Sequence, residues 1–286
     1  RIPNMTFDFT HKSMDFQVIP EKIYGSWPSH EIRVKLDSHL PIIFCVSSFV
    51  LYWWCLVPIV FPATKPTTTK SIARAETWRD VHNFSLFVYS GFTCFATLYY
   101  LWSENQLFDW HAILCTPVEG TWLRPLSVAF TFSKMVEWLD TMFIVWLGKH
   151  PPKFLHKYHH ATTFWLFCYV MNMPGAEKFG MLLNGGVHFL MYSHYWRSWP
   201  KPFVPLITGL QITQLATVIY TWYANPGECP NASFANAKVD LPFEFNMPYT
   251  MVPVFLLLFL KFFIDRFVLG KSKGSIKKNG GDDKNK

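Results

Sequence analysis

Three histidines, His156, His159 and His160, stand in the stretch FLHKYHHATTF at the edge of an apolar run. Their spacing of i, i+3 and i+4 puts them on one face of a helix. Imidazole attacks acyl groups as a nucleophile and also ligates metal ions, so this cluster could support either chemistry.

A second group of chemically active side chains lies in the stretch SKMVEWLDT, where Lys134, Glu137 and Asp140 are three residues apart. At helical spacing they fall within roughly 120° of arc. Ionisable groups at bilayer depth cost several kcal/mol each unless they are paired or hydrated. The stripe is therefore expected to face a polar interior, either as a structural ion pair of Lys134 with Glu137 or as part of a reactive site.

Polar side chains at helical spacing also occur within two later apolar segments. Four segments that each carry a polar stripe indicate one shared internal site. The later stripes comprise Asn184, His188, Met191, Tyr192 and Tyr195 in the first segment, and Thr208, Gln211 and Gln214 in the second.

The elements that must position these stripes are apolar helices. The 286-residue chain is 50% hydrophobic, 19% aromatic and only 16% charged, whereas soluble domains carry about 25% charged residues. Since a spanning helix needs about 20 apolar residues, the sequence predicts an all-α membrane protein with seven transmembrane helices. They are predicted at 40–61, 84–102, 126–147, 160–173 (with an earlier start near the histidines), 179–196, 203–224 and 249–269.

Lys and Arg alternate between the connecting segments and so predict the orientation. They are concentrated after the first, third, fifth and seventh helices, which places the C-terminus in the cytosol and the N-terminus in the lumen. The net charge of +7 then needs no nucleic-acid partner. The residues concerned are Lys65, Lys70, Arg74, Arg79, Lys149, Lys153, Lys157, Arg197, Lys201, Lys271, Lys273, Lys277 and Lys278.

These patterns divide the chain into a lumenal N-terminal segment (1–39) without the apolar core of a signal peptide, a helical domain (40–270) and a cytosolic basic tail (271–286). The six cysteines lack CxxC metal spacing. Cys115 and Cys229 fall in two lumenal connections, where they are either disulfide-bonded or two free thiols. Asn231 lies in a lumenal glycosylation sequon, as does Asn4.

Four patterns occur in order along the chain: KMVEWLDT (134–141), HKYHH (156–160), HFLMYSHY (188–195) and TGLQITQ (208–214). Together they resemble KxxExxDT, HxxHH, HxxMYxYY and TxxQxxQ of the ELO family of very-long-chain fatty-acid elongases, over residues 40–270. The third pattern departs at His194, where the family usually has Tyr. This form is similar to members acting on polyunsaturated chains, but one substitution leaves the chain preference open.

The resemblance implies a seven-helix fold in which six helices form an inverted barrel around a narrow acyl-CoA tunnel, in the endoplasmic reticulum membrane. It implies condensation of a long-chain acyl-CoA with malonyl-CoA to 3-ketoacyl-CoA, CO2 and CoA, with no cofactor and no metal. The partners implied are the two substrates, the bilayer, and the reductases and dehydratase of the elongation cycle. It also implies a disulfide between Cys115 and Cys229. Chain length and oligomeric state, including a homo-oligomer, remain open.

The chemistry implied assigns the acyl-imidazole to His159, since imidazole both attacks and leaves a thioester readily. His188 and Asn184 are expected to donate to the thioester oxygen that gains negative charge, while His156 and His160 orient the nucleophile. Glu137 and Asp140 either hold neighbouring histidines or pair with Lys134, and Lys134 either contacts CoA phosphates or is structural. The supporting positions are Thr141, Met191, Tyr192, Tyr195, Gln211 and Gln214, with Arg197, Lys201, Lys271 and Lys273 expected near the CoA phosphates.

Two other classes of protein share parts of this pattern. A di-iron membrane desaturase or hydroxylase also uses HxxHH, but it needs several such boxes, and this chain has one. A seven-helix retinal protein or receptor needs a buried lysine in its last helix. Lys261 is followed one turn later by Asp265, which favours a pair at the end of the helix instead.

Overall fold

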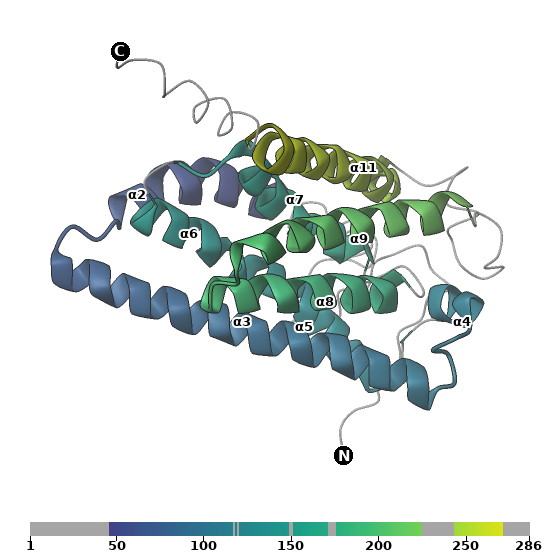
Figure 1. The fold of residues 1–286 in the computed structure, drawn as a ribbon. Helices are drawn as coiled ribbons and strands as arrows, with labels where there is room; N and C mark the ends of the chain where they lie inside the picture. The colour runs from purple at the N-terminus through teal and green to yellow at the C-terminus, as the bar shows by residue number, and fades with distance from the viewer. Residues whose placement is uncertain are drawn as a thin grey trace, which may run out of the picture.

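The computed structural model describes residues 46–116, 118, 120–148, 151–170, 176–224 and 243–270. Within these ranges the regular structure is entirely helical, and the helices lie side by side as a bundle (Figure 1). The helical segments, following a first turn at 46–50, are η2 (Leu51–Val60), α2 (Phe61–Ala63), α3 (Thr69–Ser103), α4 (Trp110–Cys115), α5 (Leu123–Val136), α6 (Trp138–Leu147), α7 (Phe154–Val170), α8 (Ala176–Trp196), η3 (Lys201–Phe203), α9 (Val204–Ala224), α11 (Phe243–Phe263) and η4 (Ile264–Val268).

Helix α3 is much longer than the predicted segment 84–102. It begins at Thr69, where a capping box fixes the first turn: Thr68 Oγ1 accepts from the Ser71 backbone N–H at 3.2 Å, and Ser71 Oγ accepts from the Thr68 N–H at 3.0 Å. Its 35 residues extend about 52 Å, well beyond a hydrocarbon core of about 30 Å. The polar first turns therefore continue the helix that hydropathy alone placed in a loop.

The predicted segment 126–147 is two helices instead of one. Helices α5 and α6 meet at Glu137, whose backbone angles are φ −62° and ψ −14°. The backbone N–H of Glu137 still donates to the Ser133 carbonyl at 3.0 Å, and that of Asp140 donates to the Glu137 carbonyl at 3.1 Å. The chain thus changes helix at the residue that carries one of the buried carboxylates.

Small residues let α3 and α8 pack closely. A methyl group on Gly91 would lie 2.7 Å from the Phe189 ring, and one on Gly185 would lie 3.3 Å from the Ser90 carbonyl oxygen. Close helix approach through small residues is the usual device of helices in membranes. It places Tyr192 of the α8 stripe near His82 of α3, with ring centres 6.5 Å apart, and α3 is a helix that none of the four sequence patterns includes.

Three helical segments within the described ranges are long and apolar enough to cross a membrane, namely Val46–Ala63, Thr69–Ser103 and Lys201–Thr221. A helical membrane protein is thereby confirmed. Seven transmembrane helices forming an inverted barrel remain a prediction. Helix α7 begins at Phe154, ahead of the histidines as expected.

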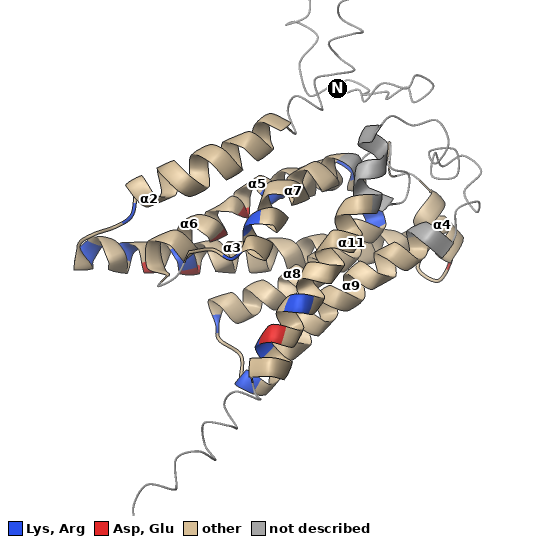
Figure 2. Cartoon of the chain, turned by 90° about the horizontal axis from the view of Figure 1, so that it is seen from above, with Lys and Arg blue, Asp and Glu red and all other residues tan. Residues whose placement is uncertain are grey.

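The basic connections gather at one end of the bundle. The α2–α3 connection, the α8–α9 turn and the C-terminal end of α11 lie at the same end in Figure 1, and α4 lies at the other. Figure 2 shows the Lys and Arg residues at these connections. At this end Lys261 Nζ lies 2.9 Å from Asp265 Oδ2, with both side chains exposed. The terminal pair expected from the sequence is thus formed.

Candidate active site

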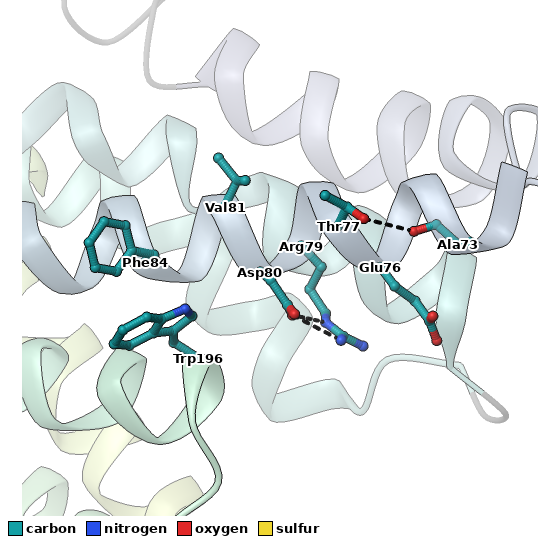
Figure 3. Close-up of a pocket in the computed structure, with 8 residues that line it drawn as sticks. All are labelled: Ala73, Glu76, Thr77, Arg79, Asp80, Val81, Phe84 and Trp196. Carbon is teal, nitrogen blue, oxygen red and sulfur yellow. Dashed lines mark hydrogen bonds and ion pairs between the residues drawn. The ribbon is translucent and has the colours of Figure 1, made fainter.

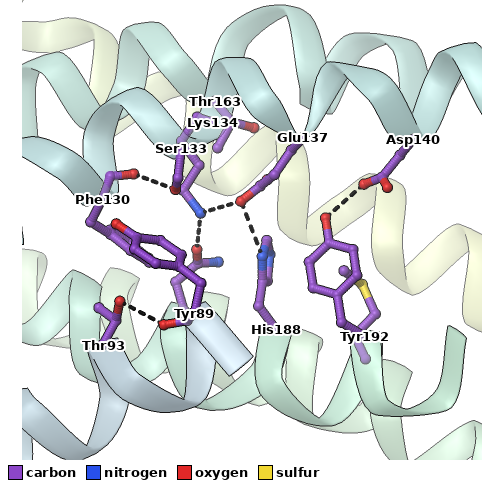
Figure 4. Close-up of polar contacts among 12 residues, drawn as sticks. Tyr89, Thr93, Phe130, Ser133, Lys134, Glu137, Asp140, Thr163, His188 and Tyr192 are labelled. Atoms are coloured by element: carbon purple, nitrogen blue, oxygen red, sulfur yellow. Dashed lines mark hydrogen bonds and ion pairs between the residues drawn. The ribbon is translucent and has the colours of Figure 1, made fainter. Parts of the chain in front are cut away.

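The centre of the polar interior is a buried ion pair joined to a histidine. Lys134 Nζ donates to Glu137 Oε1 at 2.8 Å and to Asn184 Oδ1 at 2.7 Å, and His188 Nδ1 lies 3.3 Å from the same Glu137 oxygen (Figure 4). All four residues are less than 10% exposed. A buried carboxylate needs such partners, so helices α5, α6 and α8 are held together at the site.

This arrangement fixes which atoms stay available. An ammonium only donates, so the Asn184 oxygen must face Lys134 and its amide NH2 is left to donate elsewhere. His188 Nδ1 faces Glu137 Oε1 at 3.3 Å without the geometry of a hydrogen bond, and Nε2 is the other ring nitrogen, which makes no hydrogen bond with the described residues. A neutral His188 can then take a proton at Nε2, and a protonated His188 can donate from it.

Asp140 lies on a second, neighbouring network. His82 Nε2 lies 2.9 Å from Asp140 Oδ1, and the Tyr192 hydroxyl donates to Asp140 Oδ2 at 2.6 Å. Figure 4 shows the Tyr192 contact beside the Glu137–His188 pair. Lys134 pairs with Glu137, while Asp140 holds a histidine from α3. Glu137 therefore combines the two alternatives left open by the sequence, since it pairs with Lys134 and also contacts His188, whereas Asp140 contacts His82.

A third network reaches the histidine box on α7. The Tyr52 hydroxyl is 2.7 Å from Thr141 Oγ1, which is 2.9 Å from His156 Nε2. Tyr52 is 0% exposed, and a buried hydroxyl must donate its hydrogen. If Tyr52 donates to Thr141, Thr141 donates to Nε2, and the neutral His156 ring carries its proton on Nδ1.

The three box histidines have different surroundings. The rings of His156 and His160 are 4.3 Å apart, and the Trp138 indole N–H donates to the His160 carbonyl at 2.9 Å. The His159 ring instead packs against Phe255 and Phe259 of α11, at 5.3 and 6.1 Å. Its ring nitrogens make no hydrogen bond with the described residues. The His159 ring also lies 5.4 Å from the His160 ring, so the three box histidines lie together on α7.

Other predicted residues line the margin of this region. Gln211 Nε2 on α9 lies 3.5 Å from Met191 Sδ, and the rings of Tyr192 and Tyr195 are 5.9 Å apart. Thr208 is buried. Gln214 is half-buried on α9 and makes no side-chain hydrogen bond to the part of the chain that the structure describes.

Comparison with known proteins shows which family this chain belongs to. The model of the ELO family, described as the GNS1/SUR4 family, matches residues 35–275. The chain belongs to the ELO family. It is 37% identical over 157 residues to Long chain fatty acid elongase 1 of Caenorhabditis elegans, covering 50% of this chain and 52% of the relative.

Two mammalian relatives extend this comparison. Very long chain fatty acid elongase 5 of Rattus norvegicus is 29% identical over 177 residues, which cover 58% of this chain and 55% of the relative. Very long chain fatty acid elongase 2 of Mus musculus is 27% identical over 253 residues, covering 81% and 77%. Against the worm and rat proteins, this ELO-family chain spans about half of the relative's length.

The departure of this ELO-family chain at His194 has a local structural role. The Trp199 backbone N–H donates to His194 Nδ1 at 2.9 Å, which satisfies a backbone donor just after α8 ends. The His194 ring also lies 6.4 Å from the Trp199 ring. The substituted residue therefore shapes the α8–α9 turn.

His82 and Tyr52 are the two residues at this site that sequence reasoning missed. Tyr52 lies in an apolar run and His82 in a mixed stretch that also holds Arg79, Asp80, Asn83 and Ser85, so neither side chain is marked as part of a buried site. The sequence did indicate that Asp140 and Thr141 need hydrogen-bond partners, because buried polar side chains are costly without them. The sequence did not say which helix would supply them.

Several predicted features lie away from the histidines. Cys115 is disulfide-bonded, which agrees with the disulfide that the family resemblance implies for this residue. Its predicted partner Cys229, the sequon at Asn231 and the basic residues Lys271 and Lys273 lie outside the described residues, so these assignments stay predictions. No group of three or more His, Cys, Asp or Glu side chains in the described ranges is arranged to hold a metal ion.

A surface hollow of about 570 Å³ lies between the first turns of α3 and the end of α8 (Figure 3). It is bordered by the Arg79–Asp80 ion pair at 2.9 Å and by the rings of Phe84 and Trp196, 4.7 Å apart. Its lining includes none of the predicted catalytic residues. The hollow therefore lies apart from the predicted catalytic residues.

Proposed function

We propose that this chain is the condensing enzyme of fatty-acid elongation, a 3-ketoacyl-CoA synthase that joins malonyl-CoA to a long-chain acyl-CoA. The observation that supports it best is the contrast among the histidines. His159 has unbonded ring nitrogens among the described residues and apolar neighbours, while His156 is hydrogen-bonded and His188 is paired with a carboxylate. Family membership favours this reading over a desaturase or a retinal protein.

In the first step a ring nitrogen of His159 attacks the acyl-CoA carbonyl. A C–N bond forms, the C–S bond breaks, and CoA leaves as the thiolate. The imidazole proton passes to His188 Nε2, the nitrogen that the Glu137 contact leaves free. Glu137 then stabilises the imidazolium, as carboxylates do for catalytic histidines. The product is a neutral acyl-imidazole on His159.

In the second step malonyl-CoA loses CO2 and becomes a thioester enolate. The protonated Nε2 of His188 and the amide NH2 of Asn184 are the donors available to its oxygen. The enolate carbon attacks the acyl carbon, a C–C bond forms and the C–N bond to His159 breaks. His159 recovers its proton from His188, so both imidazoles end neutral and 3-ketoacyl-CoA is released.

The surroundings fit these substrates. CoA is large and anionic, so we place its entry at the basic end, with Arg197 and Lys201 as candidate phosphate contacts. Lys134 is 1% exposed and donates to Glu137 and Asn184, which favours the structural role for this residue. We place the enzyme in the endoplasmic reticulum membrane. Its 3-keto product requires reductases and a dehydratase as the next enzymes.

The test is incorporation of labelled malonyl-CoA by membranes that contain the protein, with a panel of acyl-CoA primers. We expect a labelled 3-ketoacyl product and, with acyl-CoA alone, a mass increase on His159 equal to the acyl group. His159→Ala should lose both signals, and Tyr158→Phe, one residue away on α7, should keep them. Full activity in His159→Ala would exclude this nucleophile. No incorporation with any primer would contradict the reaction class.

A further inference from the structure

The histidine of α3 lies in none of the four family patterns, yet its side chain is fixed at the site. His82 is 9% exposed, and its ring centre lies 5.5 Å from that of the Phe143 ring. Its Nε2 contacts Asp140 Oδ1 at 2.9 Å. An ionised carboxylate accepts hydrogen bonds and does not donate them. His82 therefore presents an N–H to Asp140.

Both oxygens of Asp140 are used, each by a different helix. Oδ1 accepts from His82 of α3, and Oδ2 accepts from the Tyr192 hydroxyl of α8 at 2.6 Å. Two donors on the two oxygens fix the plane of the carboxylate. The Tyr192 hydroxyl is thereby committed to Asp140 and not available to a substrate.

Tyr192 passes this restraint to His188. It is 0% exposed, and its ring meets the His188 ring edge-on at 5.7 Å and 76°. Glu137 contacts His188 at Nδ1, and the Tyr192 ring lies against the imidazole. One neighbour thus restrains a nitrogen of His188 and the other restrains the ring orientation.

We propose that His82 is a positioning residue for the condensation, acting through Asp140 and Tyr192 on the imidazole of His188. The inference rests on the proposed function, in which His188 accepts and returns a proton and donates to the enolate. His82 touches no reacting atom in this scheme. Loss of the His82 side chain lets Asp140 and Tyr192 shift. His188 Nε2 then moves out of line with His159 and with the enolate oxygen.

A purely structural His82 would only pin α3 to α6. The two roles differ in three measurable ways. If His82 is a positioning residue, removing its side chain lowers kcat while KM for both substrates changes little, because the binding surfaces are elsewhere. A replacement that keeps an N–H in the same place restores kcat. Breaking the contact of Tyr192 with Asp140 also lowers kcat.

The experiment compares His82→Leu, which removes the donor, with His82→Gln, whose amide N–H can occupy the position of Nε2. The assay is labelled malonyl-CoA incorporation by the purified full-length protein in detergent or liposomes, with melting temperature measured in parallel. Thr97→Val is the matched control, because Thr97 is 0% exposed on the same helix and bonds only within it, to the Thr93 carbonyl.

We expect His82→Leu to lower kcat roughly 10- to 100-fold, the range for a small misplacement of a reacting group, with KM changed less than about threefold. His82→Gln should recover kcat to within about threefold of wild type, and Thr97→Val should match wild type. Tyr192→Phe should lower kcat similarly. Adding His82→Leu to Tyr192→Phe should lower it little further, because both changes release the same restraint.

Wild-type kcat in His82→Leu would overturn the proposal. So would equal losses in the Leu and Gln variants with a lowered melting temperature, or fully additive losses with Tyr192→Phe, since either pattern describes a structural histidine. A folded wild-type protein that incorporates no label would overturn the proposed function, and the His82 proposal with it. An active wild type with an unaffected His82→Leu would overturn the His82 proposal alone.

Discussion

At the scale of single residues, the buried charges form a shared system whose members depend on one another. Lys134 is 1% exposed and lies over the Phe130 ring at 4.1 Å, with Glu137 and Asn184 as its acceptors. Charges at this depth stabilise a protein only as a set, because removing one partner leaves the other unpaired. The same carboxylate also orients His188. A change that removes both charges of the Lys134–Glu137 pair should therefore affect stability and activity differently.

Replacing Lys134 tests this separation. Lys134→Met should destabilise the fold by about 3–5 kcal/mol, because Glu137 loses its ammonium. Lys134→Met with Glu137→Gln removes both charges and should regain most of the melting temperature. It should stay inactive, since no carboxylate then contacts His188. Melting followed by tryptophan fluorescence, paired with the condensation assay, checks both. A single variant as stable as wild type would show that the ammonium is not needed.

At the scale of the helices, the active residues are placed by how closely α3 and α8 approach. Gly185 lies at this contact, three residues before His188, and a methyl group there would meet the Ser90 carbonyl oxygen at 3.3 Å and the Cys94 backbone nitrogen at 3.4 Å. Backbone atoms cannot move aside as a side chain can. A larger residue must therefore separate the helices, which shifts His188 and Tyr192 relative to His82.

Gly185→Ala should thus destabilise the protein by about 1–3 kcal/mol, the usual effect of overpacking, and lower condensation activity. Gly209→Ala on α9 is the matched control, because no atom lies within 4 Å of its added methyl group. Alanine is a better helix former than glycine by about 0.5–1 kcal/mol, so the control should be neutral or slightly more stable. Equal melting temperatures for the two variants would contradict close packing at Gly185.

The helices were partly predictable, and the exceptions have physical causes. Periodic polar stripes predicted a shared interior, and the structure brings together Lys134 and Glu137 with Asn184 and His188 of α8, because burial forces charged groups to face one another. Hydropathy could not find the start of α3, since the capping box at Thr68 and Ser71 uses residues common in loops. Nor does hydropathy register the joint at Glu137, because the two helices follow one another directly and apolar residues flank the charged stretch on both sides.

At the scale of the whole molecule, the order of the four patterns predicted the family, and the family match confirmed it. The contacts between helices were not predictable. Tyr52 and His82 come from η2 and α3, and they reach Thr141 and Asp140 across 89 and 58 residues of sequence. A single sequence does not record which distant helix supplies the partner of a buried polar residue. Only the assembled bundle shows that neighbouring residues of α6 each have a partner from another helix.

The two ends of the bundle differ in a way that predicts its orientation in the membrane. Arg197 and Lys201 border the α8–α9 turn, and this turn shares its end with the α2–α3 connection and the end of α11 (Figure 1). The opposite end carries α4 and the disulfide-bonded Cys115. Positive connections stay cytosolic and disulfides form in oxidising compartments. Both observations therefore predict the same orientation, with CoA entering from the cytosol.

Inserted glycosylation sequons with flexible flanks test this orientation. A sequon beside Gly120 should be glycosylated in microsomes, because Gly120 is exposed after α4 at the predicted lumenal end and no atom lies within 4 Å of an added methyl group. The same insert beside Trp199 in the α8–α9 turn should stay unmodified. A glycosidase-sensitive mobility shift reports each result, and retained condensation activity confirms that the fold survives. Glycosylation of the insert at Trp199 and not of the insert at Gly120 would show that the bundle has the opposite orientation, with the basic end facing away from cytosolic CoA.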